Sequence, residues 1–397
     1  MRCLLDAKEV RGANAALIGV SVAVLLASST WFSGTAAAPA LARAWQLSSA
    51  AAAWLTLSTQ LGFIAGTFLY SVLNLADVYN ARRVFFGSAL AGAAFNAAFA
   101  GLADGFTSGI ALRFLTGITL AGVYPVGMKI IATWFRSGLG WRLGVMVGAL
   151  TVGTAVPYLL RVLGADLGWR GPVGLASGLA VAGGALMLVG VGDGPHLTGR
   201  AKFDPRVMVD VFRNKPFRYT AFGYFGHMWE LYAFWSLVGA YLADAGVARV
   251  PLIAFITIGA GAFGCAAGGW WSRRVGERRI ALIALLVSGT MCAASGFAHG
   301  LPDPLLITFV IVWGVFVVAD SPQFSALAVR YCPPEYTGTA LTVQNGVGFA
   351  VTLVTIQLVP LLAGEIGWQW AFVVLTAGPA FGAFYMARLG SVVDTAS

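Results

Sequence analysis

The chain has 397 residues, of which 58% are hydrophobic and only 10% are charged. Soluble domains average about 45–50% apolar and about 25% charged residues, and a globular core of this size cannot bury so much apolar surface. The composition therefore excludes a soluble enzyme, a disulfide-stabilised secreted domain and a disordered chain, and it predicts that most side chains face lipid.

Twelve stretches are apolar and long enough to cross a membrane, because a spanning helix needs about 20 mostly apolar residues. In chain order they are 14–37, 50–73, 84–103, 106–131, 142–164, 171–192, 217–242, 248–271, 280–299, 304–329, 339–363 and 368–389. The longest polar stretch, 193–216, separates the sixth from the seventh. We expect an all-α integral membrane protein with twelve transmembrane helices in two six-helix bundles, at 1–192 and 217–397, joined by this linker.

Lysine and arginine residues collect in one set of short connections, which indicates the cytoplasmic side. These are Arg2, Lys8, Arg11, Arg82, Arg83, Arg136, Arg142, Arg200, Lys202, Arg206, Arg213, Lys215, Arg273, Arg274, Arg278 and Arg279. The other side holds little beyond Arg43, Arg170 and Arg249. Both termini and the linker are therefore expected in the cytoplasm, and the net charge of +9 reflects topology, not nucleic-acid binding.

The cysteines and histidines carry no recognisable site. The four cysteines lie far apart without C-x-x-C spacing, and the three histidines are scattered along the chain. We expect no metal, disulfide or cofactor. Nor does the sequence contain a nucleotide-binding glycine loop or a nucleophile triad, so enzymatic activity is not indicated.

Three landmarks recur at nearly half the chain length. Gly168-Trp169 precedes the sixth span and Gly367-Trp368 precedes the twelfth, while Pro125 in the fourth span corresponds to Pro322 in the tenth. The basic loop at 82–83 corresponds to that at 278–279. Two homologous halves are predicted, and transporters built from repeats commonly place the substrate near the midplane, between them.

Two motifs resemble signatures of the major facilitator superfamily. The loop at 73–84 resembles G-x-L-x-D-R-x-G-R-R: Asp77 and the Arg82-Arg83 pair match, whereas Leu73, Val78 and Asn80 replace a glycine, an arginine and a glycine. A second copy at 268–279 has Arg273 in place of the acid. The fourth span reads Arg113-F-L-T-Gly117-I-T-L-A-Gly122, which resembles R-x-x-x-G-x-x-x-x-G.

With twelve spans, a half repeat and a central linker, this resemblance covers essentially the whole chain. It implies a secondary active transporter that works by alternating access, with spans 1, 4, 7 and 10 lining a central cavity. It also implies a cytoplasmic gate in which Asp77 acts with Arg82 and Arg83, since charge-assisted hydrogen bonds can tie helix ends together. The sequence as a whole most resembles the cyanate and nitrate-like bacterial branches of the family. This resemblance implies a location in the bacterial inner membrane.

An ionisable residue inside a span calls for a structural or functional explanation, because a charged side chain at the bilayer centre costs at least about 2.5–3.5 kcal/mol. Glu230 and Asp320 are candidate proton-coupling acids, because desolvation and mutual repulsion favour their neutral forms; each could instead be a structural acid. His227, one turn before Glu230, could share the proton or simply be packed. Arg113 is either the partner of an anionic substrate or a structural arginine that bonds helix carbonyls. Lys129 and Arg161 are expected to reach toward the surfaces.

Aromatic and uncharged polar residues complete the candidate substrate-binding site, because tyrosine and tryptophan combine ring contacts with hydrogen bonding. With Arg113, the set is Trp31, Tyr124, Trp229, Tyr232, Gln323, Gln344 and Asn345. Gln60 and Tyr158 are further polar residues of the spans. Many members of such a set are ordinary interhelical packing.

The sequence favours proton-coupled transport of a small, anionic solute. A multidrug or metabolite exporter, in which Glu230 pairs with a lipophilic cation, is the alternative. A membrane sensor that moves nothing is less favoured, because no soluble domain is appended to report binding. Expected partners are the solute, protons and the bilayer, with no nucleic acid and a monomeric chain.

Overall fold

The computed structural model describes residues 2–135, 138–196, 210–332 and 337–394. The side chains of 2–11, 49, 77, 165, 337–339 and 393–394 lie outside that description, as does most of the expected linker. All regular elements in the described ranges are helices.

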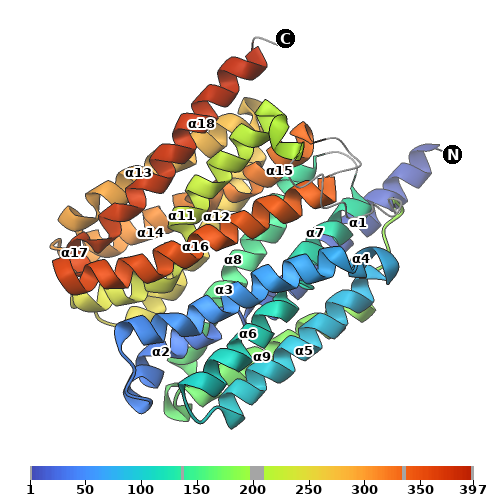
Figure 1. Ribbon diagram of the computed structural model, residues 1–397. Coiled ribbons are helices and arrows are strands. Elements are labelled where there is room, and N and C mark those ends of the chain that lie inside the picture. The colour runs from blue at the N-terminus through green and yellow to red at the C-terminus, as the bar shows by residue number, and fades with distance from the viewer. Residues whose placement is uncertain (1, 136–137, 197–209, 333–336, 395–397) are drawn as a thin grey trace.

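The first half of the chain supplies the helices that Figure 1 shows in blue to green. They are α1 (Arg2–Ser28), α2 (Ser33–Ala44), α3 (Ser49–Val72), α4 (Leu75–Val78), α5 (Ala81–Leu102), α6 (Phe106–Leu120), α7 (Tyr124–Trp134), α8 (Leu139–Leu163) and α9 (Arg170–Gly190). We call these helices the N half.

The second half of the chain, which we call the C half, lies beside the first (Figure 1). Its helices are α11 (Lys215–Asp244), α12 (Val250–Val275), α13 (Glu277–Ala298), α14 (Asp303–Ala319), α15 (Ser321–Tyr331), α16 (Thr337–Ile366), α17 (Trp368–Ala371) and α18 (Ala377–Asp394). Helix α1 begins and α18 ends at the same end of the bundle, which we call the linker end.

The expected all-helical membrane fold is confirmed. Eleven segments of the described chain are long and apolar enough to cross a membrane. The remaining expected span, 217–242, forms α11, a helix of 30 residues. A helix of that length reaches about 45 Å, so it crosses a hydrocarbon core of about 30 Å, although its tyrosine, tryptophan and histidine side chains make it more polar than the other spans.

Three spans are broken in mid-course, and two of the breaks are at the prolines that the sequence singled out. Helix α7 starts with Tyr124-Pro125, separated from the end of α6 by three residues, and α15 starts with Ser321-Pro322, with only Asp320 between it and α14. Proline has no amide hydrogen and its ring clashes with the carbonyl of residue i−4. The freed carbonyl of Val318 accepts a hydrogen bond from Cys265 Sγ at 3.3 Å. The third break, between α1 and α2, has no proline at the start of the second helix.

Glycine lets helices approach to backbone contact within and between the halves. A Cβ on Gly62 of α3 would lie 2.0 Å from the carbonyl oxygen of Phe114, and one on Gly117 would lie 2.1 Å from that of Thr59. Between the halves, a Cβ on Gly144 of α8 would lie 2.9 Å from the carbonyl oxygen of Cys265 in α12. Small residues are what close packing of membrane helices requires.

Replacing Gly62 by alanine should destabilise the N half. The added methyl group cannot avoid the Phe114 carbonyl without moving α3 away from α6, and overpacking of this kind costs typically about 1–3 kcal/mol. The matched control is Gly178→Ala in α9, where the added Cβ would meet open space. We expect a lower melting temperature in detergent for Gly62→Ala alone. Equal melting temperatures for the two variants would contradict the packing described here.

Candidate functional site

Six buried aromatic side chains meet between the two halves. Trp31, Phe32 and Phe63 belong to the N half, and Tyr232, Trp235 and Phe349 belong to the C half. The ring centroids of Phe63 and Phe349 lie 4.4 Å apart, and those of Trp31 and Tyr232 lie 5.8 Å apart. We call these six residues the aromatic cluster. It brings together Trp31 and Tyr232, two of the expected lining residues.

The other four members of the aromatic cluster were not predicted as lining residues. Phe32, Phe63 and Phe349 have no polar atom, so they carry no sequence signal that separates them from ordinary membrane packing. Trp235 lies one turn after Tyr232 on the same helix, so the sequence could have indicated it as a further lining residue. Its carbonyl oxygen accepts a hydrogen bond from Tyr158 of α8 at 3.3 Å, which joins the two halves directly.

Several polar groups are buried near the boundary between the halves without a hydrogen-bond partner among the described residues. Both amide atoms of Gln60, Gln323 and Gln344 are in this state, and so are Nε1 of Trp31 and Nε1 of Trp235. An unmade hydrogen bond of a buried group costs about 1–3 kcal/mol, so native proteins keep few of them. Unpartnered side chains of this kind on spans of both halves are available to a polar ligand that enters between the halves.

His227 and Asp320 form a buried pair. His227 Nδ1 of α11 lies 2.8 Å from Asp320 Oδ1, and the two side chains are only 1% and 2% exposed. Asp320 is the residue at which α14 ends and α15 begins. His227 Nε2 has no described partner. Of the three expected proton-coupling residues, these two lie in contact.

Glu230, the third expected proton-coupling residue, lies within the C half. It is 1% exposed. Its carboxylate accepts hydrogen bonds from Ser288 Oγ at 2.8 Å and Cys292 Sγ at 3.2 Å, both on α13, and from Trp313 Nε1 at 2.5 Å on α14. The carboxylate therefore ties α11 to the two neighbouring spans.

Arg113 is the centre of a second buried polar cluster, in the N half. Its guanidinium is fully buried and donates to the carbonyl oxygen of Thr30 at 3.0 Å, to Ser33 Oγ at 3.0 Å and to Asn96 Oδ1 at 2.8 Å. It also donates to the carbonyl oxygen of Trp31. Thr30 and Trp31 belong to the break between α1 and α2, so Arg113 satisfies carbonyl groups that have lost their helical partners. This geometry is that of the structural arginine considered above.

The two polar clusters are related by the half repeat. Ser33, Asn96 and Arg113 precede Glu230, Cys292 and Trp313 by 197, 196 and 200 residues. In the N half a cation on the fourth span donates to the first and third spans. In the C half an anion on the seventh span accepts from the ninth and tenth. Related positions therefore join the spans of each half through one buried charge, which is a cation in the N half and an anion in the C half.

The remaining expected lining residues are dispersed. Tyr124 is buried at the start of α7, and Gln344 and Asn345 are buried side by side in α16. Trp229 points into the C half, where its Nε1 donates to the carbonyl oxygen of Val374 at 3.3 Å. Gln323 lies near α12, with its Nε2 3.7 Å from a Cβ built on Gly268.

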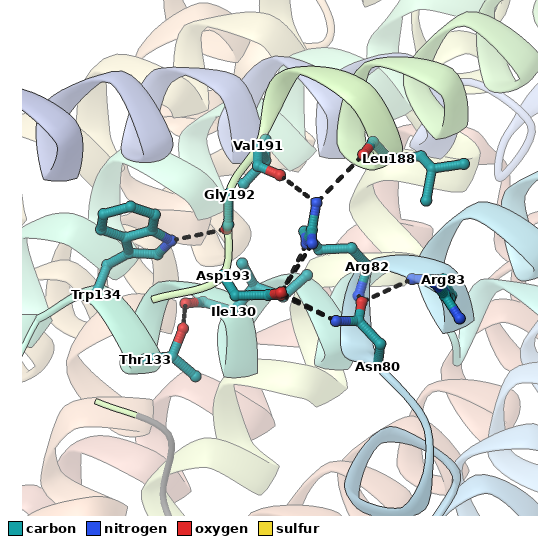
Figure 2. Close-up of polar contacts among 10 residues, drawn as sticks. All are labelled: Asn80, Arg82, Arg83, Ile130, Thr133, Trp134, Leu188, Val191, Gly192 and Asp193. Atoms are coloured by element: carbon teal, nitrogen blue, oxygen red, sulfur yellow. Dashed lines mark hydrogen bonds and ion pairs between the residues drawn. The ribbon is translucent and has the colours of Figure 1, made fainter. Parts of the chain in front are cut away.

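At the linker end, Arg82 pairs with Asp193 (Figure 2). The guanidinium Nε and Nη2 each donate to the carboxylate at 2.8 Å, and Nη1 donates to the carbonyl oxygens of Leu188 and Val191 at the end of α9. These hydrogen bonds hold the pKa of Asp193 below its ordinary value. Sequence reasoning missed Asp193, because its partner is 111 residues away.

The residues near Arg82 in the chain include Asn80 and the other two residues expected to form the cytoplasmic gate, Asp77 and Arg83. Asn80, which departs from the family motif, caps α5 by accepting from the backbone amides of Arg82 and Arg83 and donates to Asp193 at 3.0 Å. Its side-chain oxygen satisfies amides that glycine could not. The Arg83 side chain is exposed. Asp77 belongs to α4, and its side chain lies outside the described residues.

The described chain thus consists of two sets of long apolar helices that face one another across buried aromatic and polar side chains, which is the architecture of a polytopic membrane protein. The family model described as Major Facilitator Superfamily matches residues 20–356 and 220–394. Since these matches extend over most of the sequence, the chain belongs to the Major Facilitator Superfamily. A comparison with curated proteins finds no match.

Replacing Arg113 by lysine should destabilise the protein, because one ammonium cannot reach the carbonyls of both Thr30 and Trp31 and also Asn96. Each buried acceptor left unpaired costs about 1–3 kcal/mol. The control is Arg170→Lys in the same half, because Arg170 has a described bond to a single acceptor, the Ala100 carbonyl oxygen. We expect a clear drop in melting temperature for Arg113→Lys and a small one for Arg170→Lys. An unchanged melting temperature with lost anion binding would make Arg113 a substrate ligand instead.

Proposed function

We propose that this chain is a proton-coupled secondary transporter of a small solute that works by alternating access, with His227 and Asp320 as its proton site. The observation that carries the proposal is the buried contact between these two side chains at a helix break. Burial favours neutral forms, and the break gives the acid a place where helix geometry can change.

The surroundings of this pair contain further titratable groups but few charges. The rings of Tyr224 and Phe324 each lie 5.8 Å from the His227 ring. Cys265 of α12 donates to the carbonyl oxygen of Val318, two residues before Asp320. The described buried charged residues besides the pair are Arg113 and Glu230, and the contacts given above hold both within their own halves.

The charge of the pair depends on the protons it holds. A neutral imidazole with an ionised carboxylate has charge −1, one proton makes the pair neutral, and a second makes it +1. An anion is attracted only when protons are bound, so anion and protons would bind together, as thermodynamic linkage requires. Binding of the anion is therefore coupled to binding of the protons, even though Arg113 is engaged in contacts within the N half. The resemblance to cyanate and nitrate-like transporters supports a small anion.

A second candidate is an exporter of lipophilic cations, and the aromatic cluster favours it. Stacked rings between the halves could hold a flat apolar cation by ring contacts and cation–π attraction. The deprotonated pair would supply the opposite charge, and a proton would displace the cation. The two candidates therefore differ in the sign of their pH dependence.

A ligand panel at two pH values separates these candidates. The purified protein in detergent would be heated with nitrate, cyanate and small carboxylates, and with lipophilic cations, at pH 5.5 and pH 8. A ligand at about 100 times its dissociation constant stabilises by about 2.7 kcal/mol. We expect anions to raise the melting temperature more at pH 5.5. A larger shift with lipophilic cations at pH 8 would favour the exporter instead.

The role of Asp320 in coupling can be tested with the ligand that this panel identifies. In vesicles with a pH difference of two units, one coupled proton supports an accumulation of about a hundredfold. We expect Asp320→Asn to abolish accumulation while exchange of solute for solute continues. Glu230→Gln is the comparison, because the Glu230 carboxylate is tied within the C half; it should retain accumulation with lower stability.

Accumulation by Asp320→Asn at the wild-type level would overturn the assignment of the proton site. Loss of accumulation in Glu230→Gln with exchange intact would move the coupling role to Glu230. Loss of both activities in Asp320→Asn, with a normal melting temperature, would indicate that Asp320 binds the solute itself.

A further inference from the structure

A pocket of about 300 Å³ opens in the N half at the end of the bundle opposite the linker end. It lies between α2, the last turn of α8 and the start of α9. Its apolar lining includes Ala36, Ala40 and Pro172, and its charged lining consists of Arg43 and Arg161. We call it the two-arginine pocket. It is separate from the aromatic cluster and from the His227–Asp320 pair.

Arg161 is held on one side of the pocket by a hydrogen bond to α2. Its Nη1 donates to the carbonyl oxygen of Ala36 at 3.1 Å, and the side chain is half-buried. A guanidinium has five N–H donors in a planar fork, and the Ala36 carbonyl engages only one of those of Arg161. Arg43 reaches the same space from the exposed face of α2. Two like charges that line one cavity repel one another, so an anion between them is stabilised by both.

Neighbouring groups add to the positive field. Arg170, next to the pocket-lining Trp169, lies over its ring at 4.6 Å and donates to the carbonyl oxygen of Ala100. Among the residues that line the pocket there is no carboxylate. The site is therefore electropositive on one side and apolar on the other.

The volume indicates the size of the ligand. Liquid water takes about 30 Å³ per molecule, so the pocket holds roughly ten waters, more than a bare phosphate or sulfate ion displaces. It is at the lower end of the range for small-molecule pockets, about 300–1,000 Å³. Planar guanidinium groups match the oxygens of phosphate and carboxylate in pairs.

We propose that the two-arginine pocket binds an organic phosphate, with the phosphate oxygens on Arg43 and Arg161 and the apolar part against Ala36, Ala40 and Pro172. A phosphodiester headgroup of an anionic lipid and a soluble organic phosphate share this chemistry. Trp169 at the rim is of the residue type that gathers at the level of lipid headgroups. Neither source depends on the transport function proposed above.

Binding to the purified full-length protein in detergent tests the proposal. The probes are short-chain phosphatidylglycerol, short-chain diacylglycerol with the same acyl chains as the control that lacks the phosphate, and glycerol 3-phosphate. The variants are Arg161→Gln and Arg43→Gln. The matched control is Arg249→Gln, which removes an exposed arginine from the loop before α12 in the C half.

We expect one of the anionic probes to bind, and Arg161→Gln to weaken it at least about tenfold, the size of one lost charge-assisted hydrogen bond. Arg249→Gln should bind as the wild type does. Binding of phosphatidylglycerol alone identifies a lipid headgroup, and binding of glycerol 3-phosphate identifies a soluble ligand. Ala40→Phe keeps both arginines but fills the pocket, so it should also abolish binding. This variant tests the proposal even if Arg161→Gln fails to fold.

Three results would overturn the proposal. The first is binding of neither anionic probe. The second is equal binding of diacylglycerol and phosphatidylglycerol, which would show that the phosphate is irrelevant. The third is undiminished binding in Ala40→Phe and in the double variant Arg43→Gln, Arg161→Gln.

Discussion

The architecture of the N half depends on the Arg113 guanidinium. The first span stops at Ser28 and restarts at Ser33, which leaves carbonyl groups without helical partners in a region where water is scarce. An unsatisfied backbone group in a lipid environment costs several kcal/mol. Arg113 reaches these carbonyls from the fourth span and also holds Asn96 on the third. One side chain thereby makes the break tolerable and fixes three spans relative to one another.

The C half solves the corresponding problem differently. Its seventh span is continuous, so no carbonyl groups need an external donor, and the repeat-related position carries an acceptor, Glu230. The break in this half falls in the tenth span, where Asp320 faces His227, and it corresponds to the break at Pro125 in the fourth span. The two halves therefore share one break at related positions, while the N half has a further break in its first span. Such an asymmetry allows one half to hold a titratable pair while the other holds a permanent charge.

Local patterns in the sequence were sufficient for the fold. Apolar length located the spans, and Pro125 and Pro322 located two of the three helix breaks, because proline acts on its own carbonyl neighbours. The glycines of the fourth-span motif are explained by close contacts: a Cβ on Gly117 would lie 2.1 Å from the carbonyl oxygen of Thr59, and one on Gly122 would lie 2.0 Å from Ser88 Oγ. The break before Ser33 has no such local cause; it depends on Arg113, which lies 80 residues away.

The site was less predictable, because its contacts join distant spans. His227 and Asp320 could each be singled out as buried ionisable residues, but nothing in the sequence indicated that they would pair. Glu230 drew attention by its charge, whereas its three donors carry no charge and lie on other spans. At the linker end the family motif pointed to Asp77, while the described partner of Arg82 is Asp193. Asn80, a departure from that motif, proved to be a helix cap.

The contact between α8 and α12 affects how these two helices can move against one another. Gly144 and Gly148 lie against backbone atoms of Cys265 and Ala262, so at these positions no interlocking side chains join the two helices. Backbone surfaces that touch in this way have no rotamers to rearrange and no ion pair to break when one helix turns against the other. Sliding of α8 against α12 at these positions should therefore meet little resistance, which is the property that the proposed alternating access requires of a contact between the halves.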